Sequence, residues 1–184
     1  EFRNSLKGAA IQNIETNNSF FPCVQLVEDA LAECKCKYAM LKGAYLCKAY
    51  PAGYRTSNDI DLLVHPDDVT EIGNALLKLG FKQGNIRNGN FEPATRKEII
   101  ESKMSRGETV PYIKEVNLPG MRFLEVDINF SLDYKPGDTE LLKEMMSNSV
   151  VLKLGEYKVH TLRNDDFFIH LCSHLYKEAT TLPW

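Results

Sequence analysis

Apolar residues recur at intervals of three and four in several stretches of the chain, as they do along one face of an amphipathic helix. The pattern predicts long helices over residues 22–37, 66–79 and 164–179 and shorter helices over residues 44–50 and 139–146. Pro22 and Pro66 suit the first turn of a helix, and Gly80 suits a helix end. The three long stretches therefore predict the main helices of the protein.

Other stretches alternate between apolar and polar residues, or are apolar throughout, and predict strands. They cover residues 38–41, 58–64, 110–116, 122–130, 150–154 and 157–160. Turn residues at 118–120 and 155–156 join the last four of these strands into two hairpins. The polar, glycine-bearing residues 83–98 predict a loop. Helices combined with mostly paired strands predict an α/β or α+β protein, with a mixed β-sheet flanked by helices.

The strand at residues 58–64 carries two acidic residues in an otherwise apolar run. Because side chains alternate along a strand, Asp59 and Asp61 share one face, while Ile60 and Leu62 share the other. Two carboxylates side by side repel each other, so we expect a positive group between them. The alternative is an exposed edge strand that simply carries both acids.

A second strand offers a third carboxylate. In residues 123–130, Glu125, Asp127 and Asn129 alternate with a set of apolar residues. If this strand lies beside residues 59–64, Asp127 joins the first two acids. Three carboxylates from neighbouring strands suit Mg²⁺, which prefers oxygen ligands, and two such ions could serve a displacement at phosphorus. The alternative is an ordinary solvated strand face.

Charge and composition narrow the function classes. The 184 residues suffice for one domain with a sizeable core, and the net charge of −3 argues against extended nucleic-acid binding. No apolar run approaches the roughly 18 residues of a membrane helix, and we see no signal peptide. The five cysteines include no CxxC pair, which favours reduced structural thiols and a cytoplasmic location. The abrupt end after a helical pattern suggests a piece of a longer chain.

These motifs carry a resemblance to a known group of proteins. The segment "LKG" at 41–43, an arginine and "DIDLLV" at 59–64 resemble the DNA polymerase β-like nucleotidyltransferase superfamily. Within it they look most like a poorly characterised bacterial family with an LKG…R…DIDLLV signature. The later segments "VDINFSL" and "HLCSHLYKEA" also fit. The resemblance covers roughly residues 22–179, without the region 83–110.

The resemblance implies the nucleotidyltransferase fold. It places a catalytic core over residues 22–135 and a C-terminal hairpin and helix, which complete the site and could be truncated, over residues 136–184. It also implies a Mg²⁺-dependent transfer of a nucleoside monophosphate from an NTP to a hydroxyl, with release of pyrophosphate. Asp59 and Asp61 match the paired metal-binding acids. Asp127 matches the third acid, on the side of the attacking hydroxyl.

The resemblance also suggests residues for the triphosphate. Gly43 matches a glycine where the backbone approaches the phosphates, but Ala44 stands where the superfamily usually has serine. Lys42, Arg55 or Ser57 could replace the missing hydroxyl donor. Arg55 could hold phosphate oxygens through its guanidinium, although a surface ion pair is the alternative.

The last predicted helix places His170, His174 and Lys177 at positions i, i+4 and i+7, on one face. Cations on this helix reach the triphosphate in similar enzymes, so His174 and Lys177 are candidate phosphate ligands. The alternatives are plain surface polarity or helix packing. A zinc pair is disfavoured because a third ligand and the usual glutamate are missing.

The leading hypothesis is a nucleotidyltransferase that uses Mg²⁺ and an NTP. Its acceptor would be a hydroxyl on a small molecule, such as an aminoglycoside-like or sugar compound, or on a protein side chain. One alternative is a non-catalytic nucleotide-binding or regulatory module, which Ala44 favours. Another is a toxin–antitoxin component with a protein partner. The acidic balance and short chain disfavour a nucleic-acid polymerase.

Overall fold

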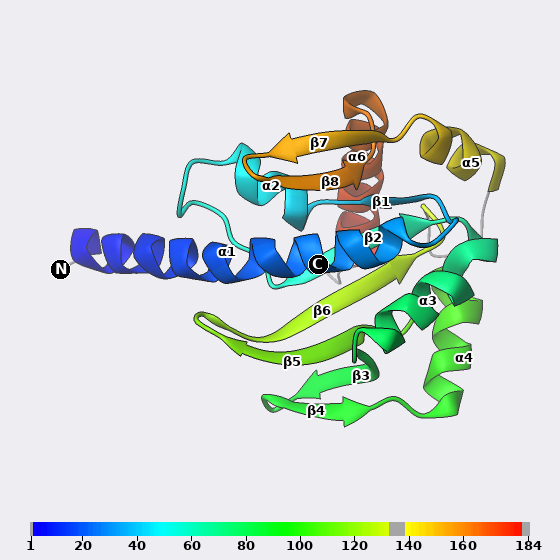
Figure 1. Ribbon diagram of the computed structural model, residues 1–184, viewed down its shortest axis with the longest axis horizontal. Helices are drawn as coiled ribbons and strands as arrows, with labels where there is room; N and C mark the ends of the chain where they lie inside the picture. The colour runs from blue at the N-terminus through cyan, green and yellow to red at the C-terminus, as the bar shows by residue number, and fades with distance from the viewer. Residues whose placement is uncertain (1, 133–138, 182–184) are drawn as a thin grey trace.

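The computed structural model describes residues 2–132 and 139–181, and its centre is a six-stranded mixed sheet (Figure 1). The strand order is β1-β2-β6-β5-β3-β4, and β7 and β8 form a separate hairpin. The strands are β1 (Tyr38–Met40), β2 (Asp59–Val64), β3 (Lys82–Arg87), β4 (Asn90–Pro93), β5 (Tyr112–Leu118), β6 (Met121–Asn129), β7 (Val150–Leu154) and β8 (Tyr157–Thr161). This arrangement confirms the predicted class, a mixed sheet flanked by helices.

Six α-helices are described around the sheet. They are α1 (Phe2–Ala32), α2 (Gly43–Ala49), α3 (Val69–Lys78), α4 (Arg96–Ser105), α5 (Thr139–Ser147) and α6 (Asn164–Thr181). A short 3₁₀ turn (Pro66–Asp68) leads into α3. No helix among the described residues combines the length and apolar content that crossing a membrane requires.

The predicted start of the first helix is wrong. The helix α1 begins at Phe2, twenty residues before Pro22, which lies inside it and is exposed. Residues 2–15 are almost all exposed, so they bury no apolar stripe and give no periodic signal. Figure 1 shows this first half of α1 projecting beyond the sheet. Apolar periodicity reports the buried face of a helix rather than the helix itself.

The predicted loop over residues 83–98 is also wrong. These residues form most of the β3–β4 hairpin and the start of α4. Both strands are largely polar, and Gly84 is the only fully buried residue of β3, so the alternation that marks a half-buried strand is missing. Thr95 and Glu98 form a reciprocal capping box that starts α4, a signal that was present in the sequence.

Two helical layers cover the central strands. On one face, Ile60, Leu62, Val126 and Ile128 join a core with α1 and α3. On the other face, Leu63 joins a smaller core with residues of α5 and α6. The acidic residues of β2 point to this second face, beside the smaller core. The carboxylates therefore lie on the face whose covering layer is incomplete.

A buried glutamate ties α1 to the rest of the molecule. Glu28 is 4% exposed and accepts a hydrogen bond from the Tyr38 hydroxyl at 3.0 Å. The backbone N–H of His160 points to both carboxylate oxygens at 3.3 Å, and the His160 Nδ1 contacts Oε1. The contacts join α1, β1 and β8. A buried charge with several partners is costly to disrupt.

We expect Glu28→Ala to lower the free energy of unfolding by about 3 kcal/mol, because it strands polar partners of a buried charge. Alanine favours the helix, so the loss measures the contacts rather than helix propensity. Tyr38→Phe, which removes one neutral donor, should cost about 1 kcal/mol. Urea unfolding at constant slope measures both. A change below about 0.5 kcal/mol for Glu28→Ala would contradict this role.

Candidate functional site

The parallel pairing of β2 and β6 brings the acidic residues together. Asp59 lies opposite Glu125, and Asp61 lies opposite Asp127. Strands that pair in this way run about 4.8 Å apart, so the four side chains stand in two adjacent rows. Asp61 is buried and the other three are partly buried. The sequence predicts that Asp127 joins Asp59 and Asp61 if the two strands lie side by side, as they do here. It assigns no role to Glu125.

Burial and neighbouring charge shift the titration of this cluster. Burial raises the pKa of Asp127 to about 8, and the carboxylates of Glu125, Asp61, Asp59 and Glu108 add to the rise. Burial also raises the pKa of Glu125, with help from Asp59 and Asp61. A low-dielectric site that concentrates negative charge favours protonated carboxyls or an added cation.

Lys42 supplies a positive group at this cluster. Its Nζ lies 3.1 Å from Oδ1 of Asp61. Lys42 precedes α2 with φ at 33°, in a region that few residues other than glycine adopt. The neighbouring Leu41 N–H donates to the backbone oxygen of Asp61 at 2.8 Å, which holds this connection against β2. The positive group expected beside the aspartates is therefore present, on Asp61.

Gly43 and Ser57 hold the start of α2 against the start of β2. A Cβ on Gly43 would lie 2.6 Å from the Ser57 Oγ and 3.1 Å from the backbone oxygen of Asp59. The Ser57 hydroxyl donates to the Asp59 carboxylate. Only glycine fits such a close approach. In the structure, these two residues position Asp59.

Arg55 does not reach the carboxylate cluster. Its backbone oxygen accepts from Asn17 Nδ2 at 2.8 Å, which fixes the loop to α1. Its guanidinium lies near Cys47, where it acts to lower the pKa of a thiol that burial raises. Its buried Nε has no hydrogen-bond partner within the described part of the chain.

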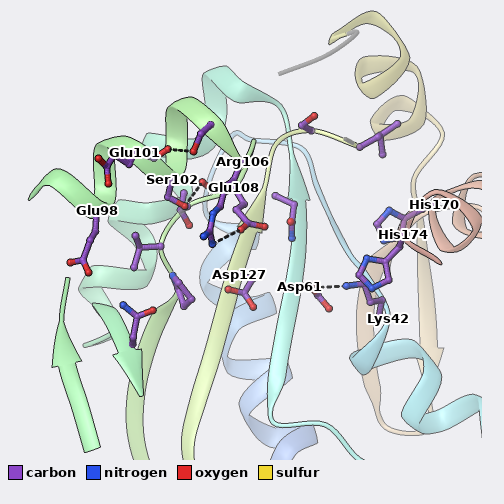
Figure 2. A pocket seen from close by; sticks show the side chains of 18 of the residues that line it. Lys42, Asp61, Glu98, Glu101, Ser102, Arg106, Glu108, Asp127, His170 and His174 are labelled. Atoms are coloured by element: carbon purple, nitrogen blue, oxygen red, sulfur yellow. Dashed lines mark hydrogen bonds and ion pairs between the residues drawn. The ribbon is translucent and has the colours of Figure 1, made fainter. Parts of the chain in front are cut away.

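A cavity of about 790 Å³ opens beside Asp61 and Asp127. Figure 2 shows that it runs from α6 across β2 and β6 to α4. Of the predicted site residues, Lys42, Asp61, Asp127 and His174 line it. The others with described side chains, Gly43, Arg55, Ser57 and Asp59, do not.

The histidines of α6 form one end of the cavity. His170 and His174 stack with ring centroids 6.3 Å apart, and Figure 2 shows both imidazoles beside Lys42. His170 is 9% exposed. The side chain of Lys177, predicted on the same face, lies outside the described residues. The structure thus places His174 near Lys42 and Asp61 at one end of the cavity.

The opposite wall was missed. It comes from β3, α4 and the segment before β5, and it includes Arg87, Ser102, Arg106 and Glu108. The polar pattern of residues 83–98 predicts a loop there and indicates no site residue in this region. The capping box at Thr95 could have revealed α4, but nothing local indicates that α4 faces Asp127.

The cluster offers the donor chemistry of a magnesium site. All its oxygen donors are carboxylates, as Mg²⁺ prefers, and burial together with the neighbouring carboxylates raises the pKa of Asp127. In the described residues, however, no three histidine, cysteine, aspartate or glutamate side chains are grouped to hold an ion. Asp61 instead pairs with the Lys42 ammonium. The residues fit a hard cation chemically, and the Lys42 ammonium balances part of their charge.

Comparisons with known proteins agree with this architecture. The model of a family of uncharacterised nucleotidyltransferases matches residues 1–184. The chain is similar to a candidate nucleotidyltransferase from Thermotoga maritima, with 12% identity and a TM-score of 0.51 over 89% of this chain and 90% of that one. It is also similar to an antigenic nucleotidyltransferase-like protein from Paracoccidioides brasiliensis, with 13% identity and a TM-score of 0.47 over 92% and 79% of the two chains. No curated protein matches.

We expect Asp127 to make the stability of the metal-free protein fall as the pH rises. Its native pKa of about 8 lies above its ordinary value of 3.8, so between these values the native state keeps a proton that the unfolded state has lost. Its contribution to the free energy of unfolding is therefore fully present below about pH 4. It amounts to a few kcal/mol and is lost as the pH rises toward 8. Urea unfolding from pH 5 to 8 in a chelator measures this decline. Asp127→Asn should flatten it, and an equal decline in both proteins would contradict the assignment.

Proposed function

The chain belongs to the family of uncharacterised nucleotidyltransferases, and we propose that it transfers a nucleoside monophosphate from an NTP to a hydroxyl acceptor. The observation that carries the proposal is the opposition of Asp61 and Asp127 at a cavity that also holds Lys42. A triphosphate needs local cations, and its transfer chemistry needs carboxylates. Both types of group meet at this one place.

The residues divide the work by charge. Lys42 leaves Asp61 to contact phosphate oxygens when nucleotide enters, and His174 binds the triphosphate from α6. The acceptor oxygen forms a bond to the α-phosphorus while the bond to the pyrophosphate leaving group breaks. Asp127, in its ionised form, takes the proton of the hydroxyl.

Asp61 and Asp127 would hold Mg²⁺, with Asp59 beside them and fixed by Ser57. When bound, Mg²⁺ would neutralise the charge that builds up on the phosphates. Gly43 keeps the start of α2 close to this edge. Arg55 acts outside the cavity, because its backbone oxygen accepts from Asn17 and so ties the loop that carries Ser57 to α1. All five cysteines are free thiols.

A non-catalytic nucleotide-binding module is the second candidate, and two observations favour it. Ala44 is 1% exposed and packs in the core, so it offers no hydroxyl to a phosphate. The Lys42–Asp61 pair also stabilises a state without metal. Against it, a simple binder has no need of four carboxylates at one place, where burial and neighbouring charge raise the pKa of Glu125 and Asp127.

We expect isothermal titration of each NTP to show binding that requires Mg²⁺. The double variant Asp59→Asn/Asp61→Asn should weaken this binding at least about tenfold, which corresponds to about 1.4 kcal/mol. Asp29→Asn, an exposed site on α1, is the matched control and should change nothing. Equal binding without Mg²⁺, or in the double variant, would contradict the proposal.

Release of pyrophosphate separates the two candidates. The native protein should release it from the bound NTP when Mg²⁺ and a panel of hydroxyl compounds are present, and Asp127→Asn should abolish the release. Tight nucleotide binding with no pyrophosphate across the panel would favour the non-catalytic module.

We expect Lys42→Met to change two affinities in opposite directions. Loss of the ammonium removes a phosphate contact, so the NTP affinity should fall about tenfold. The same loss frees Asp61, so Mn²⁺ alone, followed by its electron paramagnetic resonance signal, should bind more tightly. Lys48→Met, on the helix α2 that follows Lys42, is the control for both. Parallel changes of the two affinities would contradict the exchange of partners by Lys42.

A further inference from the structure

The proposed nucleotide site uses one end of the cavity and leaves the other end without an assigned ligand. Lys42, Asp61 and the histidines of α6 lie at one end, and α4 with the segment before β5 forms the other, as Figure 2 shows. Asp127 lies between the two ends. If the reaction is the one proposed above, the attacking hydroxyl must come to Asp127 from the side of α4.

Glu108 is the most enclosed carboxylate on this side. Its side chain is 31% exposed, against 39% for Glu98 and 61% for Glu101. Glu98 is engaged by the N-terminus of α4, whereas the Glu108 carboxylate, within the described part of the chain, has a long ion pair of 3.7 Å with the exposed Arg106. Glu108 pairs with Asn129 in an isolated β-bridge, two residues along β6 from Asp127, and both carboxylates line the cavity. Two carboxylates on one cavity favour a cation between them.

The neighbouring Thr109 presents a second, independent sign of a ligand. It lines the cavity and is 2% exposed, and its Oγ1 has no hydrogen-bond partner in the described residues. A buried hydroxyl without a partner costs about 1–3 kcal/mol. Its backbone is fixed, because its N–H donates to Ile128 at 2.9 Å. A hydroxyl of a bound molecule would supply the missing partner.

Most other residues of this wall are polar, among them Asn85, Ser102 and Ser105, while Val110 and Pro111 add a small apolar part. No phenylalanine, tyrosine or tryptophan is among the described lining residues. An aromatic or strongly hydrophobic acceptor would find few apolar side chains to pack against. The cavity of about 790 Å³ must also take the triphosphate, so the acceptor is small.

We propose that Glu108 and Thr109 bind the acceptor, and that the acceptor is a small polyhydroxylated molecule that carries a protonated amino group. Glu108 accepts hydrogen bonds from the ammonium, and Thr109 pairs with a hydroxyl. Another hydroxyl then faces Asp127, to which it gives its proton as its oxygen bonds to the α-phosphorus and pyrophosphate leaves. That this ligand is the acceptor rests on the proposed function, whereas its binding does not.

The test titrates the full chain, without nucleotide or Mg²⁺, with D-glucosamine and 2-deoxystreptamine. D-glucose and myo-inositol are the neutral counterparts. At least one aminated probe should bind about tenfold more tightly than its counterpart, and Glu108→Gln should remove the difference. Glu115→Gln, which breaks a similar ion pair with Arg122 farther along β5, is the matched control and should leave it intact. No preference for the aminated probes, or an unchanged preference in Glu108→Gln, would overturn the inference.

Thr109→Val separates a ligand role from a structural one. Because the variant removes a hydroxyl without a partner, thermal unfolding should occur at the same or a higher temperature, while the aminated probe binds more weakly. Unchanged probe binding would overturn the role of Thr109. If the native protein binds the aminated probe but no NTP, the result counts against the proposed function alone. If it binds NTP but shows no preference for the aminated probe, the result counts against the acceptor site alone.

Discussion

Repulsion between carboxylates on β2 and β6 is the constraint on which the rest of the site depends. The parallel register sets Asp61 directly opposite Asp127. It also sets Asp59 opposite Glu125, the next pair along the same face of the two strands. Such charge persists in a folded protein only if protons, cations or water balance it. The raised pKa of Asp127 and the ammonium of Lys42 are the two ways in which the metal-free chain achieves this.

The layers of the fold follow from the same strands. Their apolar residues fill a continuous core under α1 and α3, so the carboxylates can only face the other side. There α5 and α6 cover part of the sheet and stop short of β6 and β5. The uncovered part becomes the cavity, whose floor carries charge and whose walls come from α6 and α4. The larger apolar core and the carboxylate cluster thus lie on opposite faces of one sheet.

The polar strands and helix between residues 82 and 105 extend this design. They bury little apolar surface, so they contribute more to the wall of the cavity than to the core. A wall that need not be hydrophobic is free to present carboxylates, hydroxyls and amides to a ligand. This explains why the segment that the sequence reveals least is also the segment that would distinguish one acceptor from another.

The sequence by itself determined the elements that bury a periodic apolar face, including β2, β6 and α6, and it placed Asp59 and Asp61 on one side of a strand. It missed the first half of α1 and the β3–β4 hairpin, because exposed or polar elements carry no such period. Only the tertiary structure decided which strand pairs with β2, that Lys42 reaches Asp61 while Arg55 does not, and that Glu108 and Thr109 stand across from the histidines. Those relations join residues 19 to 66 positions apart in the chain, and they depend on register and packing, which no local pattern encodes.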